Sequence, residues 1–563
     1  MYVSPQPRLI MRVLLLYPNL YGMNMLPPAI GLFTALLRRD GHVVSLFDTT
    51  VYENMAPVDS DMQKAENLNA RPYDDALLKQ QALHTDPLAD FRNQVKQFAP
   101  DLIAMSVTED MYPIGITLLK NLGKKRPLVV VGGVFPTFAP ELALRYSEGC
   151  IDYVLKGEGD ETLPQFCRSL EQGIDVSSVP GLHANLFGKL VDNPLPRPVD
   201  LATLPLPDYG LFDESRFYRP MQGNLWRMLP VQTIRGCPYT CAYCNSPWQE
   251  EIHKKAGHKF FRKQRTDFIR DELRHCVEVY KADSFYFWAD TFLAWNEMEF
   301  EEFCEMYSDF RLPFWIQTRP ETVKAHRFKK LRDIGLLRVS FGVEHGNEAF
   351  RERILHRRVK NESIIANLKI VTDMGIPISV NNIIGFPTET RDLVFDTIEL
   401  NRNFASDGIN AYSFTPFHGT PLRQLSEELG FVKIGELSRS IMAPTMLEMP
   451  QFPREVIEGI RRCFVLYVKM PKTYWPEIAR AERLTPEGDA IFKALKEKCR
   501  TNFMNYGDYA KEADVEAVDL NLNGSASGLD FDRNIKKPAD FEAILRSHAR
   551  KSPSGERAII WIK

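Results

Sequence analysis

Three cysteines stand close together in the stretch Ile234-Arg235-Gly236-Cys237-Pro238-Tyr239-Thr240-Cys241-Ala242-Tyr243-Cys244. Their C-x3-C-x2-C spacing lets one tight loop aim three thiolates at a single point. Cysteine thiolates hold [4Fe-4S] clusters in proteins, and three of them leave the fourth iron of the cube without a protein ligand. The stretch therefore predicts Cys237, Cys241 and Cys244 as ligands of a cluster with one open iron, where chemistry can happen.

A structural zinc site or three unrelated buried cysteines are the alternatives for this loop. A closed zinc site needs a fourth Cys or His at a characteristic spacing, and the nearest candidate is His253, in a basic stretch. The other six cysteines are scattered singly, which argues against a disulfide framework and against a second cluster. They are Cys150, Cys167, Cys276, Cys304, Cys463 and Cys499.

The loop resembles the cluster loop of the radical S-adenosylmethionine (SAM) superfamily. The likeness includes Arg235-Gly236 before the first cysteine and the aromatic Tyr243 before the last. The resemblance implies that the amino and carboxylate groups of SAM chelate the open iron. It also implies that an electron from the cluster splits SAM to a 5′-deoxyadenosyl radical.

Length and composition describe an ordinary globular chain. Its 563 residues are too many for one hydrophobic core and suggest about three or four domains. A formal net charge of -3 with no basic stripe predicts no nucleic-acid partner. The N-terminus lacks the apolar core of a signal peptide, and no stretch approaches the ~18 apolar residues that span a bilayer. We therefore expect a cytoplasmic protein without a membrane contact, in a reducing, anaerobic setting.

Residues 1–200 alternate apolar runs with helical stretches, which is typical of a parallel sheet covered by helices. We expect strands at Arg12 to Tyr17, Val43 to Phe47, Leu102 to Val107, Leu128 to Val131 and Tyr153 to Leu155. Five such strands predict a doubly wound, flavodoxin-like α/β domain, with its ligand beyond the carboxyl ends of the strands.

Small and polar residues follow three of these strands. No G-x-G-x-x-G follows the first strand, so a dinucleotide is the weaker hypothesis. The pattern resembles the cobalamin-binding domain that precedes many radical SAM domains, including the Pro27 to Leu32 segment that opens the first helix. The resemblance implies cobalamin contacts at Ser106, Thr108, Tyr112, Gly132, Gly133, Gly157, Glu158 and Gly159.

One departure concerns the lower face of cobalt. Cobalamin domains of the methionine synthase and mutase type carry D-x-H-x-x-G, and this chain has no such motif. We therefore expect a lower face that is vacant or approached by another side chain, with Tyr112 and Met111 as candidates. Ordinary packing on the following helix is the alternative for both residues.

Two further segments connect the predicted units. Residues 49–97 are longer than a crossover needs, and we expect them to cap the cofactor. Residues 201–229 form the predicted linker, in which Leu201 to Tyr209 is stiffened by Pro205 and Pro207.

Residues 230–421 alternate strands and helices again. The six expected strands match the partial (β/α)6 barrel of the radical SAM superfamily, whose functional groups gather at the carboxyl ends of the strands. They are Pro230 to Ile234, Ser284 to Trp288, Phe314 to Thr318, Arg338 to Val343, Ile378 to Ile384 and Ala411 to Thr415.

The same resemblance implies SAM contacts at the ends of these strands, beside Tyr243 of the loop. Asp290 stands where the family binds the amino nitrogen, and a carboxylate suits an ammonium. Glu344 matches the ribose-binding acid, since a carboxylate can accept hydrogen bonds from both hydroxyls. The other implied contacts are Gln317 and Arg319 to the carboxylate, Ile384 and Gly385 to adenine, and Phe417 at the end of the sixth strand.

Residues 422–563 form a mostly helical region, with apolar positions at helical spacing in Arg454 to Val468 and Asp489 to Cys499. Asn521 to Gly528 predicts a flexible loop. We expect this region to close one side of the barrel and to shape the substrate pocket.

A cobalamin-binding domain followed by a radical SAM domain resembles the class B radical SAM methylases. The resemblance implies methyl transfer from methylcobalamin to an unactivated carbon, through the 5′-deoxyadenosyl radical. The alternatives are a cyclase or rearrangement enzyme with the same cofactors and, from another class, a cobalamin-dependent sensor with a vestigial cluster. The partners implied are a small-molecule or peptide substrate and an external electron donor such as flavodoxin or ferredoxin, and the protein is expected to be a monomer.

Overall fold

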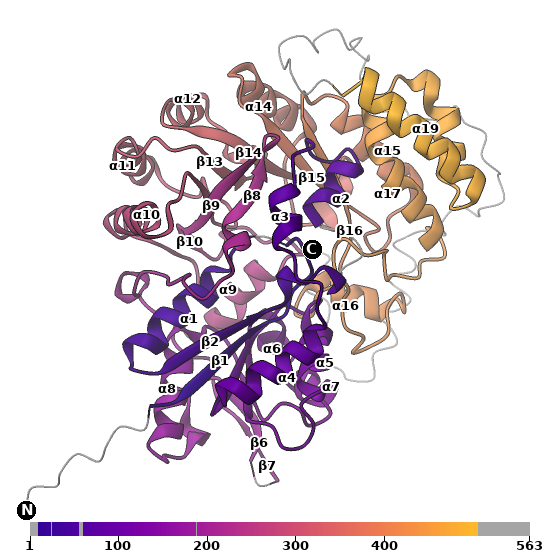
Figure 1. The fold of residues 1–563 in the computed structure, drawn as a ribbon. Helices are drawn as coiled ribbons and strands as arrows, with labels where there is room; N and C mark the ends of the chain where they lie inside the picture. Colours follow the sequence, from indigo (N-terminus) through magenta and orange to yellow (C-terminus); the bar gives the residue numbers. More distant parts are fainter. Residues whose placement is uncertain (1–9, 24, 56–59, 187, 505–563) are drawn as a thin grey trace, which may run out of the picture.

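The chain forms two seven-stranded sheets and a helical C-terminal part (Figure 1). The computed structural model describes residues 10–23, 25–55, 60–186 and 188–504. In Figure 1 the N-terminal sheet lies at the bottom, the second sheet above it and the C-terminal helices at the right. The predicted fold class is confirmed: a doubly wound sheet, a partial barrel and a mostly helical third part.

The N-terminal sheet has the strand order β2-β1-β3-β4-β5-β6-β7. Strands β1 to β5 pair in parallel in the flavodoxin-like order, whereas β6 and β7 add an antiparallel hairpin that the sequence did not predict. The strands are β1 (Arg12–Tyr17), β2 (Val43–Asp48), β3 (Leu102–Ser106), β4 (Leu128–Gly132), β5 (Tyr153–Leu155), β6 (Leu182–Leu186) and β7 (Lys189–Asp192).

Side chains of this sheet alternate between two cores, because successive residues of a strand point to opposite faces. Leu14 and Leu16 of β1 pack with the buried side chains of the helices on the outer face. Val13 and Leu15 belong instead to a cluster that continues into the barrel. The helices are α1 (Pro28–Arg39), α2 (Ser60–Glu66), α3 (Ala76–Gln81), α4 (Pro87–Phe98), α5 (Tyr112–Lys120), α6 (Val134–Phe138), α7 (Pro140–Tyr146) and α8 (Gly159–Glu171).

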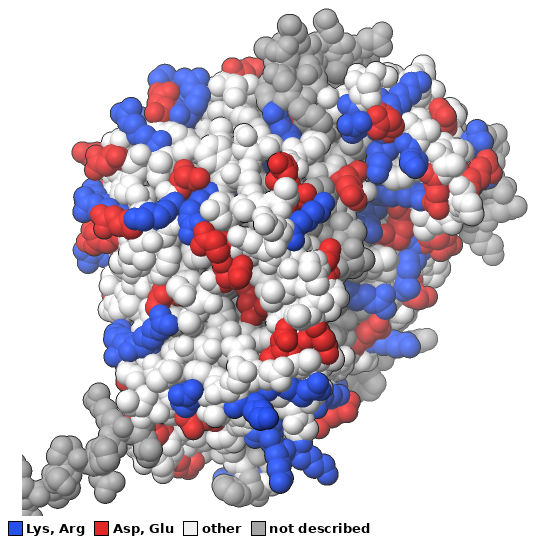
Figure 2. Space-filling model, in the orientation of Figure 1, with Lys and Arg blue, Asp and Glu red and all other residues white. Residues whose placement is uncertain are grey.

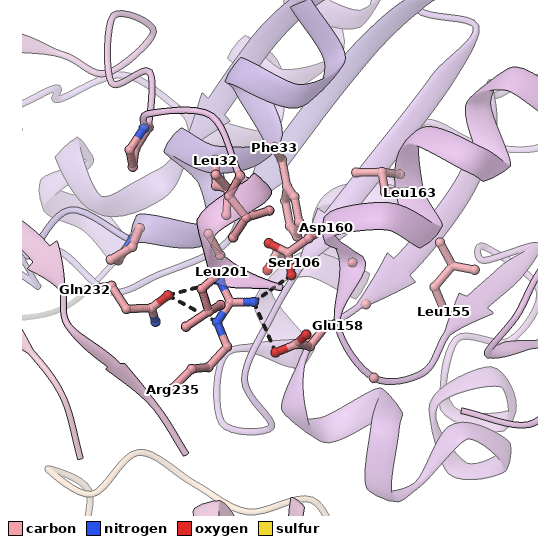
Figure 3. A pocket seen from close by; sticks show the side chains of 18 of the residues that line it. Leu32, Phe33, Ser106, Leu155, Glu158, Asp160, Leu163, Leu201, Gln232 and Arg235 are labelled. Carbon is pink, nitrogen blue, oxygen red and sulfur yellow. Dashed lines mark hydrogen bonds and ion pairs between the residues drawn. The ribbon is translucent and has the colours of Figure 1, made fainter. Parts of the chain in front are cut away.

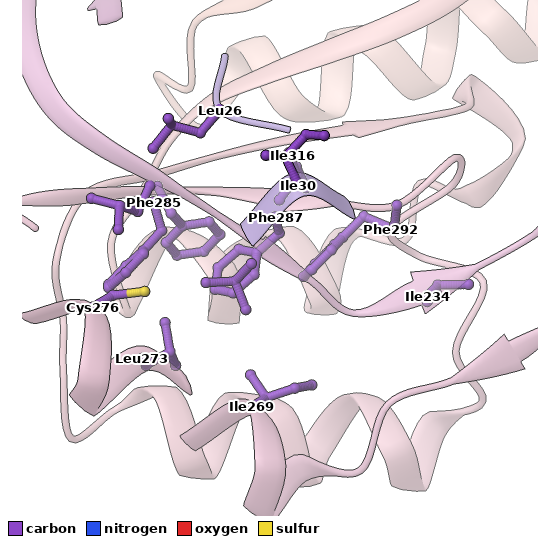
Figure 4. Close-up of a cluster of buried hydrophobic side chains, with 14 of the residues drawn as sticks. Leu26, Ile30, Ile234, Ile269, Leu273, Cys276, Phe285, Phe287, Phe292 and Ile316 are labelled. Carbon is purple, nitrogen blue, oxygen red and sulfur yellow. The ribbon is translucent and has the colours of Figure 1, made fainter. Parts of the chain in front are cut away.

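The shared cluster fixes the N-terminal sheet against the barrel. Figure 4 shows Leu26, which lies just before α1, and Ile30, in its first turn, among barrel side chains that include Phe285 and Ile316. Burying a large apolar side chain contributes roughly 1.5 to 3 kcal/mol relative to exposure. The two sheets therefore share one core, and their relative position is part of the fold.

The second sheet is ordered β16-β15-β14-β13-β12-β9-β8. Six strands run parallel, and the unpredicted β8 pairs antiparallel with β9 at the edge. The expected strand at Pro230 to Ile234 is divided, because β10 leaves the sheet and pairs antiparallel with β11. The strands are β8 (Tyr218–Met221), β9 (Asn224–Gln232), β10 (Ile234–Arg235), β11 (Arg262–Lys263), β12 (Ser284–Trp288), β13 (Phe314–Thr318), β14 (Leu336–Glu344), β15 (Ile378–Ile384) and β16 (Gly408–Ser413).

Helices cover the outer face of this sheet (Figure 1). Local sequence sets where they begin: at α11, Asn296 and Glu299 form a reciprocal capping box. The helices are α9 (Asn245–Lys255), α10 (Thr266–Tyr280), α11 (Glu297–Tyr307), α12 (Ala325–Asp333), α13 (Glu348–Arg353), α14 (Asn361–Asp373) and α15 (Arg391–Asn401).

The C-terminal part closes one edge of the barrel, because α17 packs against α15 and the edge strand β16. Its helices are α16 (Pro421–Glu428), α17 (Arg454–Lys469), α18 (Trp475–Ala481) and α19 (Pro486–Asn502). The loop expected at Asn521 to Gly528 lies outside the described residues. The domain boundaries expected at residues 200, 229 and 421 stay predictions.

The described helices and the surface charges bear on contacts with membranes and nucleic acids. Among the described residues, no helix has the length and apolar character needed to cross a bilayer. On the face in Figure 2, basic and acidic side chains are largely interspersed rather than gathered in a stripe of one sign.

Candidate functional site

The three cysteines lie on a turn between β10 and α9. Gly236 has a φ of 89°, and a Cβ there would come within 3.1 Å of Phe261 Cα, so the turn requires glycine. Cys237 and Cys241 are buried, and Cys244 is the residue before the first turn of α9. Cys237 Sγ lies 3.6 Å from Thr291 Oγ1, and Arg319 donates to Cys241 Sγ at 3.1 Å. The loop is therefore held against the ends of β12 and β13.

The donor set fits an iron–sulfur cube with one open iron. Burial raises the pKa of the Cys244 thiol, and Asp290, Cys241 and Cys237 raise it further, so the thiols are near neighbours. The alternative for this loop is a single zinc ion. Among the described residues, no group of three or more His, Cys, Asp or Glu is arranged to hold one metal ion. His253, the nearest candidate for a fourth zinc ligand, stacks on Phe260 with ring centroids 4.9 Å apart.

Asp290 lies directly beside the cluster loop. It follows β12, and Ser246 Oγ donates to its Oδ2 at 2.5 Å. Asp290 is an exposed residue, but desolvation by the surrounding protein raises the pKa of its carboxyl. Because its ionised form is poorly solvated, this carboxylate would be stabilised by a cationic ligand. This position agrees with the predicted contact to the SAM amino group, which stays a prediction.

Gln317 and Arg319 lie at the carboxyl end of β13, and the side chains of both have protein partners. Tyr286 donates to Gln317 Oε1 at 2.8 Å. Arg319 lies 3.7 Å over the ring of Tyr239 and pairs with Glu321 at 2.6 Å. Arg319 therefore places positive charge beside the cluster loop as well as at the predicted SAM carboxylate.

Glu344 ends β14 in a strained conformation. Its φ is 71°, and a Cβ at Gly342 would come 2.4 Å from Glu344 Oε1, so the carboxyl folds back over that glycine. Burial raises the pKa of Glu344, while Arg357, 3.3 Å away, opposes the shift. Arg357 also donates to the Tyr243 hydroxyl at 3.4 Å, so the predicted ribose acid and the loop aromatic share one buried arginine.

The expected adenine segment, residues 384–389, is fixed by the acid at its own end, Glu389. Ile384 is fully buried, and Gly385 has a φ of 84°. Glu389 Oε2 accepts from Gly385 N at 2.5 Å and from Phe386 N at 3.0 Å. Phe417, half-buried after β16, stands one residue before His418. The backbone around the predicted adenine contacts is thus held in one conformation.

A cavity of about 290 Å³ lies between the N-terminal sheet and the barrel, and we call it the interdomain cavity (Figure 3). Six of the eight predicted cobalamin residues line it: Ser106, Gly132, Gly133, Gly157, Glu158 and Gly159. They follow the carboxyl ends of β3, β4 and β5, as expected for a doubly wound sheet. A Cβ at Gly133 would lie 2.3 Å from Val107 O, so glycine is needed for this backbone to fold beside the cavity.

Thr108 and Tyr112 do not line the interdomain cavity. Thr108 is exposed and donates to Asp110 at 2.6 Å. Tyr112 is fully buried, donates to Ala143 O at 2.6 Å and packs on Phe135, as the packing alternative describes. The lower axial side of cobalt stays a prediction.

An ionic bridge joins the two motif regions. Arg235, two residues before Cys237, pairs with Glu158 at 3.1 Å and with Asp160 at 2.7 Å (Figure 3). Arg262 of β11 also pairs with Glu158. Burial would raise the pKa of Glu158, but the two arginines hold it below its usual value. The glycine-rich loop after β5 and the cluster loop are thereby fastened to each other.

Both segments between the predicted units contribute residues to cavities. Leu201, Leu204, Pro205 and Pro207 of the linker line the interdomain cavity. None of the described residues of segment 49–97 lines it. Lys64 and the stretch 69–73 instead border a second cavity inside the barrel.

Sequence reasoning missed three residues at these sites. Glu272 of α10 lines the interdomain cavity and is 2% exposed, and its carboxyl forms no hydrogen bond or ion pair with any described residue. Trp288 is 36% exposed at the barrel mouth, on the same side of β12 as Tyr286. Helical and strand periodicity could have found both, whereas the buried Arg357 carries no local signal.

Comparisons with known proteins agree with both halves of this site. Residues 22–167 match the B12 binding domain, and residues 231–400 match the radical SAM superfamily. An uncharacterized methyltransferase of Pyrococcus horikoshii is 25% identical over 398 residues, which are 69% of this chain and 83% of that protein. The hopanoid C-3 methylase of Methylococcus capsulatus is 26% identical over 444 residues, 76% of this chain and 79% of that one. The anaerobic magnesium-protoporphyrin IX monomethyl ester cyclase of Rubrivivax gelatinosus is 26% identical over 396 residues, 66% of this chain and 67% of that one.

Solved structures share the fold. The cobalamin-dependent SAM radical enzyme OxsB has a TM-score of 0.59 at 15% identity, over 87% of this chain and 71% of that one. The radical SAM methyltransferase TsrM from Kitasatospora setae, solved with cobalamin and a [4Fe-4S] cluster, has a TM-score of 0.56 at 14% identity, over 87% of this chain and 100% of that one.

The matched families imply a [4Fe-4S] cluster, SAM and cobalamin as cofactors, and the residues at the two sites agree with them. The protein is an enzyme, with three cluster thiols at the barrel mouth and a glycine-lined cavity at the N-terminal sheet. With a B12-binding domain followed by a radical SAM domain, the chain belongs to the cobalamin-dependent radical SAM enzymes.

Proposed function

We propose that the protein is a C-methyltransferase acting on an unactivated carbon of a small molecule or peptide. When bound, the cluster and SAM supply a radical that removes a hydrogen atom, and cobalamin supplies the methyl group. Relatives named as a methyltransferase and as a hopanoid methylase support this proposal.

The observation that carries the proposal is the bridge from Arg235 to Glu158 and Asp160. Arg235 stands two residues before the first cluster cysteine, and both acids belong to the start of the helix that follows β5. A buried ion pair with several hydrogen bonds resists separation, because parting the charges leaves each of them unpaired in a poorly solvated place. The candidate sites are therefore kept adjacent, as two groups that act on one substrate require.

A second contact holds the halves together on the other side of the loop. Glu109, after β3, is 3% exposed and accepts from His418 N at 2.9 Å and from Ser438 N at 2.8 Å. His418 Nδ1 also lies 2.7 Å from Glu109 Oε1. This contact supports a position of the N-terminal half over the ends of the barrel strands.

A cyclase or rearrangement enzyme is the second candidate. It is favoured by relatives named anaerobic magnesium-protoporphyrin IX monomethyl ester cyclase in three organisms. Both candidates require the same cofactor positions and differ in whether a methyl group is transferred.

The test uses anaerobically reconstituted enzyme with SAM labelled by a trideuteromethyl group, given small-molecule and peptide extracts of the source organism. Methyl transfer is expected to give a labelled product together with 5′-deoxyadenosine and S-adenosylhomocysteine, measured by mass spectrometry. A cyclase would give 5′-deoxyadenosine and a changed, unlabelled product. Cys241→Ala is the control and is expected to give neither product.

The proposal includes two further expectations. A one-electron donor outside this chain, such as flavodoxin or ferredoxin, is needed to reduce the cluster, because the described cysteines offer no second cluster site. We also expect a monomer, which light scattering of the reconstituted protein would check.

A further inference from the structure

We propose that a second cavity, inside the barrel, binds an anionic group of the substrate, a carboxylate or a phosphate, and that Arg219 is the residue that recognises it. This inference rests on the proposed function only in treating the occupant as the substrate. We call this space the barrel cavity; its volume is about 180 Å³.

The barrel cavity is built from the inner faces of five parallel strands. Pairs of residues two apart line it, and such pairs point to the same face of a strand. They are Trp315 and Gln317 of β13, Arg338 and Ser340 of β14, Ser379 and Asn381 of β15, and Asn410 and Tyr412 of β16, with Tyr286 of β12 beside them. Its remaining wall is formed by β8, by the turn at residues 222–223, and by Lys64 and residues 69–73.

The cavity adjoins the predicted SAM site. Gln317, a predicted contact to the SAM carboxylate, also lines the cavity and accepts from Tyr286 at 2.8 Å. Burial is the main reason that the pKa of Tyr286 rises to about 12; Arg219 opposes the rise and Asp290 adds to it. Tyr286 therefore lies within electrostatic reach of both the cavity and the acid beside the cluster loop.

The charge of the lining is one-sided. Lys64, Arg71, Arg219 and Arg338 line the cavity, and no Asp or Glu is among its lining residues. Asp407, just behind the wall, pairs with Arg71 at 3.0 Å and lies 3.5 Å from Arg338. One carboxylate thus serves both Arg71 and Arg338, and no carboxylate lines the cavity beside Arg219.

Arg219 lines the cavity without the counter-charge that Arg71 and Arg338 have in Asp407, so its guanidinium can bind a ligand. Its guanidinium lies 4.7 Å over the ring of Trp315 and 5.3 Å over that of Tyr286. The side chain is half-buried, and its guanidinium forms no ion pair or hydrogen bond with any residue that the structure describes. Stacking on aromatic rings fixes the plane of the guanidinium and leaves its N–H groups for the forked contact that carboxylates and phosphates accept.

Other polar atoms near the cavity also lack partners in the described part of the chain. They are Arg338 Nε, a donor, and Asn410 Oδ1, an acceptor, both on lining residues that are less than a tenth exposed. A hydrocarbon occupant would leave such atoms unpaired, and each buried polar atom without a hydrogen bond costs roughly 1 to 3 kcal/mol. A polar occupant, with its negative group toward Arg219, fits the cavity better.

The experiment measures binding to the SAM-loaded, cluster-containing protein, so that the SAM carboxylate already occupies its own site. The probes are inorganic phosphate and succinate, followed by isothermal titration calorimetry, with succinamide as the uncharged probe of matched size. The variants are Arg219→Gln and Arg219→Lys. Arg332→Gln, on the exposed side of α12, is the matched control.

Wild-type protein and the Arg332→Gln control are expected to bind at least one anion saturably and succinamide at least tenfold more weakly. Arg219→Gln is expected to weaken anion binding at least tenfold, and Arg219→Lys to recover part of it. Absence of saturable anion binding by the wild type, equal binding by Arg219→Gln, or equal binding of succinamide and succinate would each overturn the proposal.

Failure here is distinguishable from failure of the proposed function. Methyl transfer without anion binding would remove the site and keep the methyltransferase. Anion binding by a protein that transfers no methyl group would keep the site and remove the methyltransferase.

Discussion

The interdomain cavity and the barrel cavity lie in one molecule but are built from different parts of the chain. The interdomain cavity is bordered by the glycine loops, by prolines and apolar side chains, and by the paired Arg235, Glu158 and Asp160, with Glu272 in its wall. The barrel cavity is lined by polar side chains from five strands and by four cations.

The difference shows which changes each cavity tolerates. A space formed by backbone accepts a large ligand of fixed shape, and it is damaged most by an added Cβ. A space formed by side chains is retuned by exchanging those side chains, while its strands stay in place. This contrast predicts that a substitution at one site leaves the ligand of the other site bound. Four measurements test how independently the sites are built.

The largest expected effect follows from Cys241→Ala. Three thiolates are the minimum set that the loop offers, so loss of one is expected to abolish cluster assembly and SAM cleavage. Cobalamin binding should change by less than about threefold, since the cysteine does not line the interdomain cavity. Iron analysis measures cluster assembly, and absorbance titration measures cobalamin binding. Loss of both ligands in this variant would contradict the independence of the two sites.

A Cβ at Gly133 is expected to be the next most severe change. Gly133 has a φ of 118°, and the added atom would lie 2.3 Å from Val107 O. Strain and overlap together predict a loss of about 2 to 5 kcal/mol in the free energy of unfolding for Gly133→Ala. Gly132→Ala is the matched control, because its Cβ would make an ordinary contact of 3.5 Å. Chemical denaturation compares them, and equal stabilities would mean that this loop is not fixed by its backbone.

Glu272 predicts a pH dependence of stability. Burial raises its pKa from 4.5 to about 8, so between these values the folded protein binds a proton that the unfolded chain releases. In the protein without cofactors, the contribution of Glu272 to stability therefore falls as pH rises from about 4.5 to 8. Glu272→Gln stays neutral and is expected to be more stable than wild type above pH 8, by about 2 to 4 kcal/mol, and equal to it near pH 4.5.

The comparison with Glu272→Gln uses Glu278→Gln, on the exposed side of the same helix, as its control. Thermal unfolding at pH 5, 7 and 9 gives the trend. A wild-type curve parallel to that of Glu272→Gln would show that this carboxyl ionises freely in the folded state.

The smallest expected effects are at the predicted SAM contacts. Asp290→Ala and Glu344→Ala each remove a charge-assisted hydrogen bond, which costs ~1.5 to 3 kcal/mol, or about one to two decades in affinity for SAM. Asp309→Ala, exposed after α11, is the control, and Glu344→Gln preserves the volume at the strained position. Unchanged SAM affinity in both alanine variants would remove these residues from the site.

The parts of the molecule that sequence predicts best are those written in local patterns. The strands Arg12–Tyr17, Ser284–Trp288 and Ile378–Ile384 have the expected bounds, because buried apolar runs bounded by turn residues carry a clear signal. The glycine loops and the cysteine loop also lie at the strand ends where they were expected. For these features, the spacing of neighbours along the chain was sufficient.

The rest depends on contacts between distant residues. Arg71 reaches Asp407 across 336 positions, and no local pattern in segment 49–97 shows that it covers the barrel cavity rather than the cofactor. The pairing of Arg235 with Glu158 joins residues 77 positions apart. The C-terminal part closes the edge of the sheet as expected, but none of its described residues after 421 lines either cavity.

The bridge at Arg235 also bears on how such chains can recombine. Arg235 belongs to the half that carries the cluster, and its partners Glu158 and Asp160 belong to the half that carries the glycine loops. A hybrid with an N-terminal half from another gene would leave this arginine buried without a counter-charge unless the donor supplied an acid at one of those two positions. An N-terminal half from another gene therefore has to carry an acid at position 158 or 160 if Arg235 is to keep a partner.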